Sequence, residues 1–274
     1  MTTRRASIGV FDSGFGGLTV LKELAARIPD ADYLYFGDTA RLPYGSKSVE
    51  TVARYAVGAA HFLEERGAEM LVIACNTATA LAFDQVCQAS HIPAIGVVEP
   101  GSEVATASTR ERKVVVIATE ATVSSHAYLK ALQRRGVDAR EKACPLLVPL
   151  VEEGWVEHPV TEEVARIYLK EAFTDGFRAA DVLVLGCTHY PLIKNLLRRV
   201  APVHVSIVDS AESTAQVVAE RLQRAPLASS GDAERRAAAR MKFFATDSVD
   251  KFRRLGAMFL GHAIEDVQHV DLKE

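Results

Sequence analysis

Short apolar runs alternate with segments of helical spacing along most of the chain. Apolar runs without polar alternation are typical of strands that are buried on both faces of a parallel sheet. They predict strands at residues 7–11, 33–36, 69–74, 94–98, 113–118, 181–186, 203–208, 242–245 and 267–270. Helical spacing predicts helices at 18–27, 48–65, 125–135, 161–173, 192–200, 213–224 and 248–260, with another that ends near 91. The alternation predicts an α/β fold with doubly wound, mainly parallel sheets, which bind ligands at the carboxyl ends of their strands.

Breaks in this pattern predict the connections. The segment 99–101, Glu-Pro-Gly, predicts a turn, and 119–122 predicts a loop. Residues 146–154 predict an irregular apolar segment. Residues 225–239 are rich in Ala, Ser and Arg, which predicts a linker.

Two of the predicted strands end in the same order of residue types. Residues 69–77 and 181–189 each begin with an acid, continue with apolar residues, and end in a small residue, a cysteine and polar groups. An offset of 112 residues aligns Cys75 with Cys187, and an offset of 107 aligns the ends of the preceding strands. Apolar strands also resemble one another by composition alone. Because the residues after the strands match as well, we predict two similar α/β halves that each place one cysteine in a shared cleft.

The chain of 274 residues is longer than one typical domain. We expect a first domain at 1–98 plus 209–274 and a second domain at 99–208. Asp12 and Cys75 fall in the first domain. The other candidates for acid or base chemistry fall in the second domain, namely Glu152, Cys187 and His189.

The two strand-end cysteines are the main candidates for chemistry. A cysteine between a parallel strand and a helix lies near free backbone N–H groups and the positive end of the helix dipole. We therefore expect a lowered thiol pKa at Cys75 and Cys187. Cys87 and Cys144 are expected to be structural, because free cysteine commonly behaves as a small buried hydrophobe.

Each of these cysteines has a candidate partner for proton transfer. Asp12, at the end of the first strand, is expected beside the Cys75 loop, where a carboxylate can accept or orient a proton. His189 follows Cys187 by two residues and is the corresponding candidate there, with Glu152 or Glu153 as a further acid or base.

Neutral donors follow several strand ends. Hydroxyls, amides and backbone N–H groups can hold a carboxylate without arginine, so an anionic substrate is expected. The same residue types are common helix caps. The donors are Ser13, Asn76, Thr77, Thr119, Thr122 and Thr188.

Two opposed thiols suit the removal of a proton from one face of a carbon and its delivery to the other face. The site must also stabilise the negative charge that develops on a weak carbon acid. The glycine turn 14–17 lacks the third glycine of the dinucleotide fingerprint, and no pyridoxal motif is visible. We therefore expect chemistry without a cofactor.

Composition narrows the partners. A net charge of -3 and a pI near 6.3 argue against nucleic acid and against a polybasic membrane surface. The apolar run 8–11 is too short for a signal peptide, and no run is long enough to cross a bilayer. We expect a cytoplasmic protein that binds a small molecule. The four cysteines show neither a disulfide framework nor zinc-ribbon spacing.

Four motifs, in this order, resemble those of glutamate racemases, which are cofactor-independent members of the aspartate/glutamate racemase superfamily. The motifs are Phe11-Asp12-Ser13-Gly14 with Gly16-Gly17, Pro43-Tyr44-Gly45, Ala74-Cys75-Asn76-Thr77-Ala78 and Leu185-Gly186-Cys187-Thr188-His189-Tyr190-Pro191. The resemblance spans about residues 8–210. It departs from the family pattern at Ala118-Thr119, where the family usually has Gly-Thr.

The resemblance implies two pseudo-symmetric α/β domains with the active site between them, interconversion of L- and D-glutamate for peptidoglycan, and a homodimer. It implies that Cys75 and Cys187 act on opposite faces of the α carbon. Asp12 and His189 would assist them, and Glu152 would support His189. The residues that match substrate-binding positions are Asp12, Ser13, Tyr44, Gly45, Asn76, Thr77, Thr119, Thr122, Thr188 and His189.

Other functions remain open at this point. The same fold can racemise aspartate or another small acid, and a substrate panel distinguishes these. A binder of acidic amino acids would saturate with glutamate without changing its chirality. A thiol redox protein would form a reversible Cys75–Cys187 disulfide. A metal site at Cys187 and His189 lacks further ligands at metal spacing.

Overall fold

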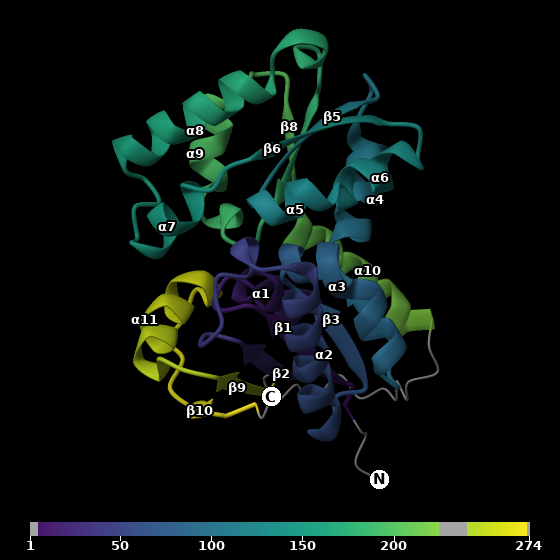
Figure 1. Cartoon of the computed structure of the whole chain (residues 1–274), viewed down its shortest axis with the longest axis vertical. Helices are drawn as coiled ribbons and strands as arrows, with labels where there is room; N and C mark the ends of the chain where they lie inside the picture. Colours follow the sequence, from purple (N-terminus) through teal and green to yellow (C-terminus); the bar gives the residue numbers. More distant parts are fainter. Residues whose placement is uncertain (1–4, 225–239, 273–274) are drawn as a thin grey trace.

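The computed structural model describes residues 5–224 and 240–272, which form two domains one above the other in Figure 1. Each domain is built on its own β-sheet, and all of the strand pairs in the described residues are parallel. The predicted α/β fold is therefore confirmed. The linker predicted at 225–239 lies outside the described residues.

The first sheet has six strands in the order β10-β9-β2-β1-β3-β4. They are β1 (Ser7–Asp12), β2 (Asp32–Gly37), β3 (Met70–Ile73), β4 (Ala94–Gly96), β9 (Met241–Ala245) and β10 (Val267–His269). α1 (Leu18–Arg27) and α11 (Val249–Leu260) cover one face, and α2 (Val49–Glu65) and α3 (Asn76–Ala89) cover the other. Successive side chains of a strand point to opposite faces, so the buried strands of this doubly wound sheet are apolar throughout.

The second sheet has four strands in the order β6-β5-β7-β8. They are β5 (Lys113–Ala118), β6 (Asp138–Ala143), β7 (Val182–Gly186) and β8 (Ser206–Asp209). Helices again pack on both faces. On one face these are α4 (Val98–Ser108) and α6 (Ala127–Gln133), and on the other they are α7 (Leu147–Glu152), α8 (Pro159–Ala172) and α9 (Lys194–Val200).

Strand register brings distant residues to the edge of each sheet that faces the other domain. In the first sheet, Phe11 of β1 pairs with Ile73 of β3, so Asp12 ends its strand beside the loop that holds Cys75. In the second sheet, Ala118 pairs with Gly186, and the next residues along the two chains, Thr119 and Cys187, leave the sheet together. The carboxyl ends of both sheets therefore supply the residues of the cleft.

Three predicted connections are wrong, because they contain helices. The predicted turn 99–101 lies in the first turn and a half of α4. A proline is tolerated at this end because the first helical N–H groups have no partner within the helix. The predicted loop 119–122 opens α5 (Glu120–Ser125), and the segment predicted as irregular, 146–154, contains α7. Helices this short are stabilised by packing, so they leave little periodicity to detect.

One strand, β6, has no apolar run and was not predicted. Its sequence, Asp-Ala-Arg-Glu-Lys-Ala, is rich in charge, and most of its residues are only half-buried. It lies at the edge of the second sheet, where charged side chains prevent pairing with other chains.

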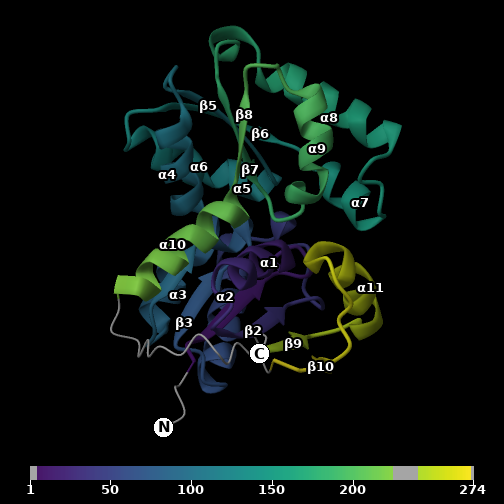
Figure 2. The same ribbon diagram turned by 180° about the vertical axis from the view of Figure 1, so that it is seen from behind.

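The chain returns from the second domain to the first through α10 (Ser210–Arg224). This helix follows β8 directly and packs against both α4 and α1, so it joins the two domains (Figure 2). Apart from Asp209, the last residue of β8, the strands of each sheet lie within one of the two predicted domains, and the boundaries themselves stay a prediction.

Candidate active site

A cavity of about 450 Å³ lies between the two domains. It is lined by the strand ends, by the loop 42–46 and by residues of α7 as far as its last residue, Glu152. With the exceptions of Thr122 and Glu153, every residue that the sequence indicated as a site candidate lines it. These residues are Asp12, Ser13, Tyr44, Gly45, Cys75, Asn76, Thr77, Thr119, Glu152, Cys187, Thr188 and His189.

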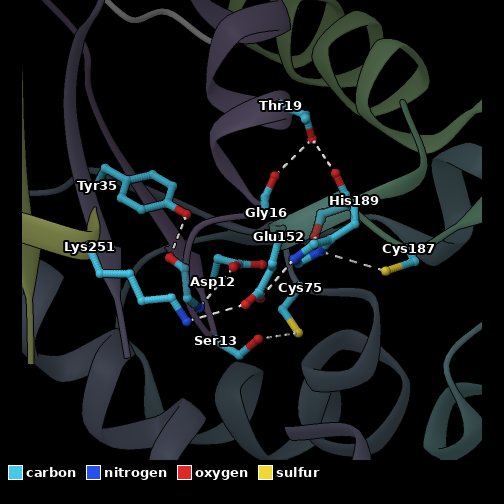
Figure 3. A network of polar contacts seen from close by, with 12 residues as sticks. Asp12, Ser13, Gly16, Thr19, Tyr35, Cys75, Glu152, Cys187, His189 and Lys251 are labelled. Atoms are coloured by element: carbon cyan, nitrogen blue, oxygen red, sulfur yellow. Dashed lines mark hydrogen bonds and ion pairs between the residues drawn. The ribbon is translucent and has the colours of Figure 1, made fainter. Parts of the chain in front are cut away.

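Cys75 follows β3 after one residue, Ala74, and caps α3. Its Sγ accepts a hydrogen bond from the N–H of Ala78 at 3.4 Å, and its thiol donates to Ser13 Oγ at 3.5 Å (Figure 3). Burial and the nearby charge of Asp12 nevertheless raise the pKa of the Cys75 thiol to about 12. The prediction of a lowered pKa is therefore wrong for Cys75, because burial outweighs the helix N-terminus.

Asp12 is almost fully buried at the end of β1. Its Oδ2 accepts a hydrogen bond from Gly14 N at 2.8 Å, and its Oδ1 has no partner among the described residues. Burial raises the pKa of Asp12, although His189 and backbone N–H groups oppose the shift. The carboxyl group packs tightly against its own turn, since a Cβ on Gly17 would lie 2.5 Å from Asp12 Cβ. Asp12 is thus held in one place with one oxygen free.

Cys187 lies in a different setting, at the end of β7. The sequence predicted that Cys187 lies near the N-terminus of a helix, but a short 3₁₀ turn, Tyr190–Ile193, separates it from α9. Its Sγ lies 3.8 Å from His189 Nδ1, and His189 Nε2 lies 3.3 Å from Glu152 Oε1. Of the two acids predicted as alternatives, Glu152 therefore contacts the histidine, and Glu153 is exposed.

The charges of this second group reinforce one another. Burial opposes a positive charge on His189, but hydrogen bonds to Cys187 and Glu152 outweigh it and raise the pKa of His189 to about 10. Burial also opposes the charge on Glu152, but His189 and Lys251 bring the pKa of Glu152 below its usual value. His189 and Glu152 are therefore an ion pair near neutral pH.

A cluster of three threonine hydroxyls joins the two domains at the back of the cavity. Thr77 Oγ1, from the first domain, lies 2.9 Å from Thr119 Oγ1 and 3.3 Å from Thr122 Oγ1, both from the second. Thr119 Oγ1 and Thr122 Oγ1 are themselves 2.9 Å apart. Thr122 is fully buried behind the other two, so it contacts the lining residues and does not line the cavity itself.

Two buried residues that the sequence did not indicate hold lining side chains in place. Tyr128 donates a hydrogen bond to Asn76 Oδ1 at 2.7 Å, which leaves Asn76 Nδ2 without a partner among the described residues. Asp38 accepts from the Tyr44 hydroxyl at 2.6 Å, so this hydroxyl is already engaged. Local pattern does not reveal such residues, because each looks like an ordinary member of its helix or loop.

The glycine turn of the first domain meets the Cys187 loop directly. A Cβ on Gly16 would overlap Thr188 Oγ1 and would lie within 2.6 Å of His189 Nδ1. The Thr19 hydroxyl also donates to the carbonyl oxygen of Thr188 at 3.0 Å (Figure 3). Glycine at position 16 is therefore required by the close approach of the two domains.

In the part of the chain that the structure describes, no group of three or more His, Cys, Asp or Glu side chains is arranged to hold a metal ion. Across the same residues, none of the helices combines the length and the apolar composition needed to cross a membrane.

Comparison with known proteins gives the class of this fold and site. The family model described as Asp/Glu/Hydantoin racemase matches residues 18–218, which is most of the chain. The chain therefore belongs to the Asp/Glu/Hydantoin racemase family, and the prediction of a racemase, an isomerase, is confirmed.

Within that family, the chain is similar to proteins named glutamate racemase. One from Koribacter versatilis is 61% identical, with 99% of each chain covered. A crystal structure of glutamate racemase from Francisella tularensis in complex with D-glutamate is 35% identical, with a TM-score of 0.88 and 98% of each chain covered. An aspartate racemase from Picrophilus torridus is 19% identical with a TM-score of 0.57, so it shares the fold alone.

Proposed function

We propose that this protein interconverts L- and D-glutamate without a cofactor, by a two-base mechanism in which Cys75 and Cys187 act on opposite faces of the α carbon. The observation that carries the proposal is that the two thiols come from different domains and line the same cavity. Each has its own partner for proton transfer, Asp12 for Cys75 and His189 for Cys187.

In the reaction, one cysteine is a thiolate and removes the α-proton, which leaves the electron pair of the C–H bond on the α carbon. The other cysteine is a thiol and donates its proton to the opposite face of that carbon. The two sulfurs have then exchanged their protonation states, and the configuration is inverted. The reverse reaction uses the same groups in exchanged roles.

The two halves begin in different protonation states. The raised pKa of Cys75 keeps this residue as the thiol in the resting protein. His189, an imidazolium paired with Glu152, places its positive charge beside Cys187 Sγ, where it can stabilise a thiolate. Asp12 Oδ1, which has no hydrogen-bond partner among the described residues, can accept or return the proton of Cys75 when the direction is reversed.

The substrate carboxylates are held by neutral donors. The donors proposed for this role are Ser13, Asn76, Thr77, Thr119 and Thr188, with the backbone N–H groups of Tyr44 and Gly45. Asn76 Nδ2 is a buried donor with no partner in the described residues, which supports this role. Donors aimed at a carboxylate also stabilise the charge that develops as the α-proton leaves.

Three further parts of the proposal rest on the resemblance to glutamate racemases. The D-glutamate formed would be used for peptidoglycan. The protein would act in the cytoplasm, and it would be a homodimer. Each can be tested separately from the chemistry, the last by measuring the mass of the protein in solution.

Incubation with L-glutamate in heavy water tests the reaction itself. The protein, stripped of small molecules by dialysis, should form D-glutamate with deuterium at the α carbon, because the second thiol takes its proton from solvent. D-glutamate should give labelled L-glutamate in the same way. Faster turnover of L-aspartate than of L-glutamate would show that aspartate, and not glutamate, is the substrate. No turnover of either amino acid would overturn the proposal.

A further inference from the structure

Four polar side chains form a continuous line at the edge of the cavity (Figure 3). Lys251 Nζ lies 3.4 Å from Glu152 Oε2, Glu152 Oε1 lies 3.3 Å from His189 Nε2, and His189 Nδ1 lies 3.8 Å from Cys187 Sγ. The two oxygens of Glu152 thus have different partners. The mechanism proposed above uses three of these residues and leaves Lys251 without a role.

Lys251 reaches this line from the other domain. It lies in the first turn of α11, on the first sheet, whereas Glu152, His189 and Cys187 belong to the second domain. The helix is fixed by buried aromatic side chains, and one of them, Phe259, makes a T-shaped contact with the His189 ring at a centroid distance of 5.0 Å. The Lys251 ammonium also lies 5.4 Å from the centroid of the Phe15 ring, which lines the cavity.

The partners of Lys251 are more buried than an ordinary surface ion pair. The Glu152 side chain is 19% exposed and the His189 side chain 12%, while Lys251 is 42% exposed. A carboxylate in such a place has lost much of its water, so each remaining partner has a larger effect on its orientation and charge. The charged or titratable groups that act on Glu152 and His189 are Lys251, Asp12 and Cys187.

We propose that Lys251 is a positioning residue for proton transfer at Cys187, and that it acts across the domain boundary by holding Glu152 in the orientation that supports His189. With Oε2 bound to Lys251, Oε1 points at His189 Nε2. Without the ammonium group, the carboxylate is free to rotate about its last bond, and His189 loses a fixed partner. This inference rests on the proposed function, because it assigns Lys251 to the same reaction.

The position of Lys251 links the orientation of Glu152 to the distance between the two domains. Its contact with Glu152 exists only when α11 and α7 are as close as they are here. Separation of the domains would therefore remove one of the two partners of Glu152. The support of His189 is therefore complete only when α11 and α7 are in contact through Lys251 and Glu152.

Three variants test the proposal in the full-length protein. Lys251→Met removes the ammonium and keeps an apolar chain of similar length, whereas Lys251→Arg keeps the charge. Arg254→Met is the matched control, because Arg254 is an exposed cation on the same helix. Lys251→Met should lower kcat for glutamate about 10-fold, with KM changed less than about 2-fold, since the loss affects proton transfer and not substrate binding. Lys251→Arg should recover most of the rate, and Arg254→Met should match the parent protein.

The pH profile separates positioning from a purely structural effect. Lys251 lowers the pKa of Glu152, so its removal should raise that pKa. The acid limb of kcat/KM should therefore move to higher pH in Lys251→Met, by about half a unit to one unit. Carboxyl-¹³C NMR titration of Glu152, assigned with Glu152→Gln, should show the same upward shift without substrate.

The outcomes distinguish this inference from the proposed function. If the parent protein does not racemise glutamate, the proposed function fails, and the NMR titration still decides whether Lys251 controls Glu152. If the parent protein racemises glutamate but Lys251→Met leaves kcat and the acid limb unchanged, only the role of Lys251 is overturned. Equal decreases of kcat in Lys251→Met and Arg254→Met would also overturn the role of Lys251.

Discussion

The Cys75 half and the Cys187 half of the cavity share a sequence pattern but differ in their electrostatics. Cys75 caps a long helix, donates to Ser13 and lies near the buried carboxyl group of Asp12. Cys187 is followed by a 3₁₀ turn and contacts His189, which is paired with Glu152. The first setting favours a neutral thiol, and the second can stabilise a thiolate. A two-base racemase needs one group of each kind, so the difference between the halves is itself suited to the reaction.

The largest expected effect comes from removing each thiol in turn. Cys75→Ser and Cys187→Ser should each lower kcat/KM for racemisation by about 10³-fold or more, because serine is a far weaker acid and base at neutral pH. L- and D-glutamate have the same free energy, so kcat/KM must fall equally in the two directions. Polarimetry measures the rate in each direction.

The same two variants should still differ in solvent exchange. Each retains one thiol and should exchange the α-proton of one enantiomer only, with opposite preferences in the two variants. Proton NMR in heavy water follows this exchange without requiring inversion. Normal racemisation in either variant, or the same enantiomer preference in both, would contradict the assignment of the thiols to opposite faces.

A smaller but more specific effect is expected at Asp12. Asp12→Asn should lower kcat by about 10²-fold, because Cys75 loses the group that accepts or returns its proton. Removal of the charge should also lower the pKa of Cys75, since the carboxylate helps to raise it. The Cys75 thiol should thus react faster with iodoacetamide at pH 8 while racemisation slows. A parallel fall in the reactivity of Cys75 and in the rate of racemisation would instead indicate damage to the fold.

In the parent protein, the two thiols should differ in alkylation by at least about 10-fold at pH 8, with Cys187 the faster. A protonated His189 stabilises a thiolate beside it, whereas the Cys75 pKa of about 12 keeps that sulfur protonated. Because the Cys75 group loses its proton as the pH rises toward this value, its rate should increase steadily up to pH 10. Peptide mass spectrometry measures both sites, and equal rates at pH 8 would remove the difference between the halves.

The smallest effect is expected at Tyr128, which lies in the second domain and contacts Asn76 in the first. Tyr128→Phe removes one hydroxyl and leaves the ring in place, so Asn76 can turn its amide away from the cavity. KM for glutamate should rise about 5-fold, with kcat nearly unchanged, because binding and not proton transfer is affected. Steady-state kinetics in both directions measure this change. A fall in kcat at constant KM would show that Asn76 has another role.

Much of the site was predictable because its residues directly follow apolar strands. A buried strand in a parallel sheet delivers the next residues to one edge, so Asp12, Cys75 and Cys187 could be grouped from the sequence alone. His189 could be predicted for the same reason, because it follows Cys187 by two residues. The sequence narrowed the supporting acid only to Glu152 or Glu153, because the segment that carries them has no clear helical or strand period.

Residues that act from the side of the cavity were not predictable. Lys251 is 99 residues from Glu152 along the chain, and Tyr128 is 52 residues from Asn76. Asp38 is close in sequence to Tyr44, but nothing in its loop distinguishes a buried acceptor from a solvated acid. These contacts depend on how helices pack, which local patterns of apolar residues do not encode.

The sequence by itself determined the parallel α/β architecture, the two cysteine loops and the family to which the chain belongs, because strand composition and the residues after each strand are local properties. Only the tertiary structure decided the charge state around each thiol. The helix N-terminus at Cys75 favours a thiolate, yet the burial of this residue beside Asp12 raises its pKa to about 12. Desolvation depends on everything packed around a group, and that packing is assembled from both domains.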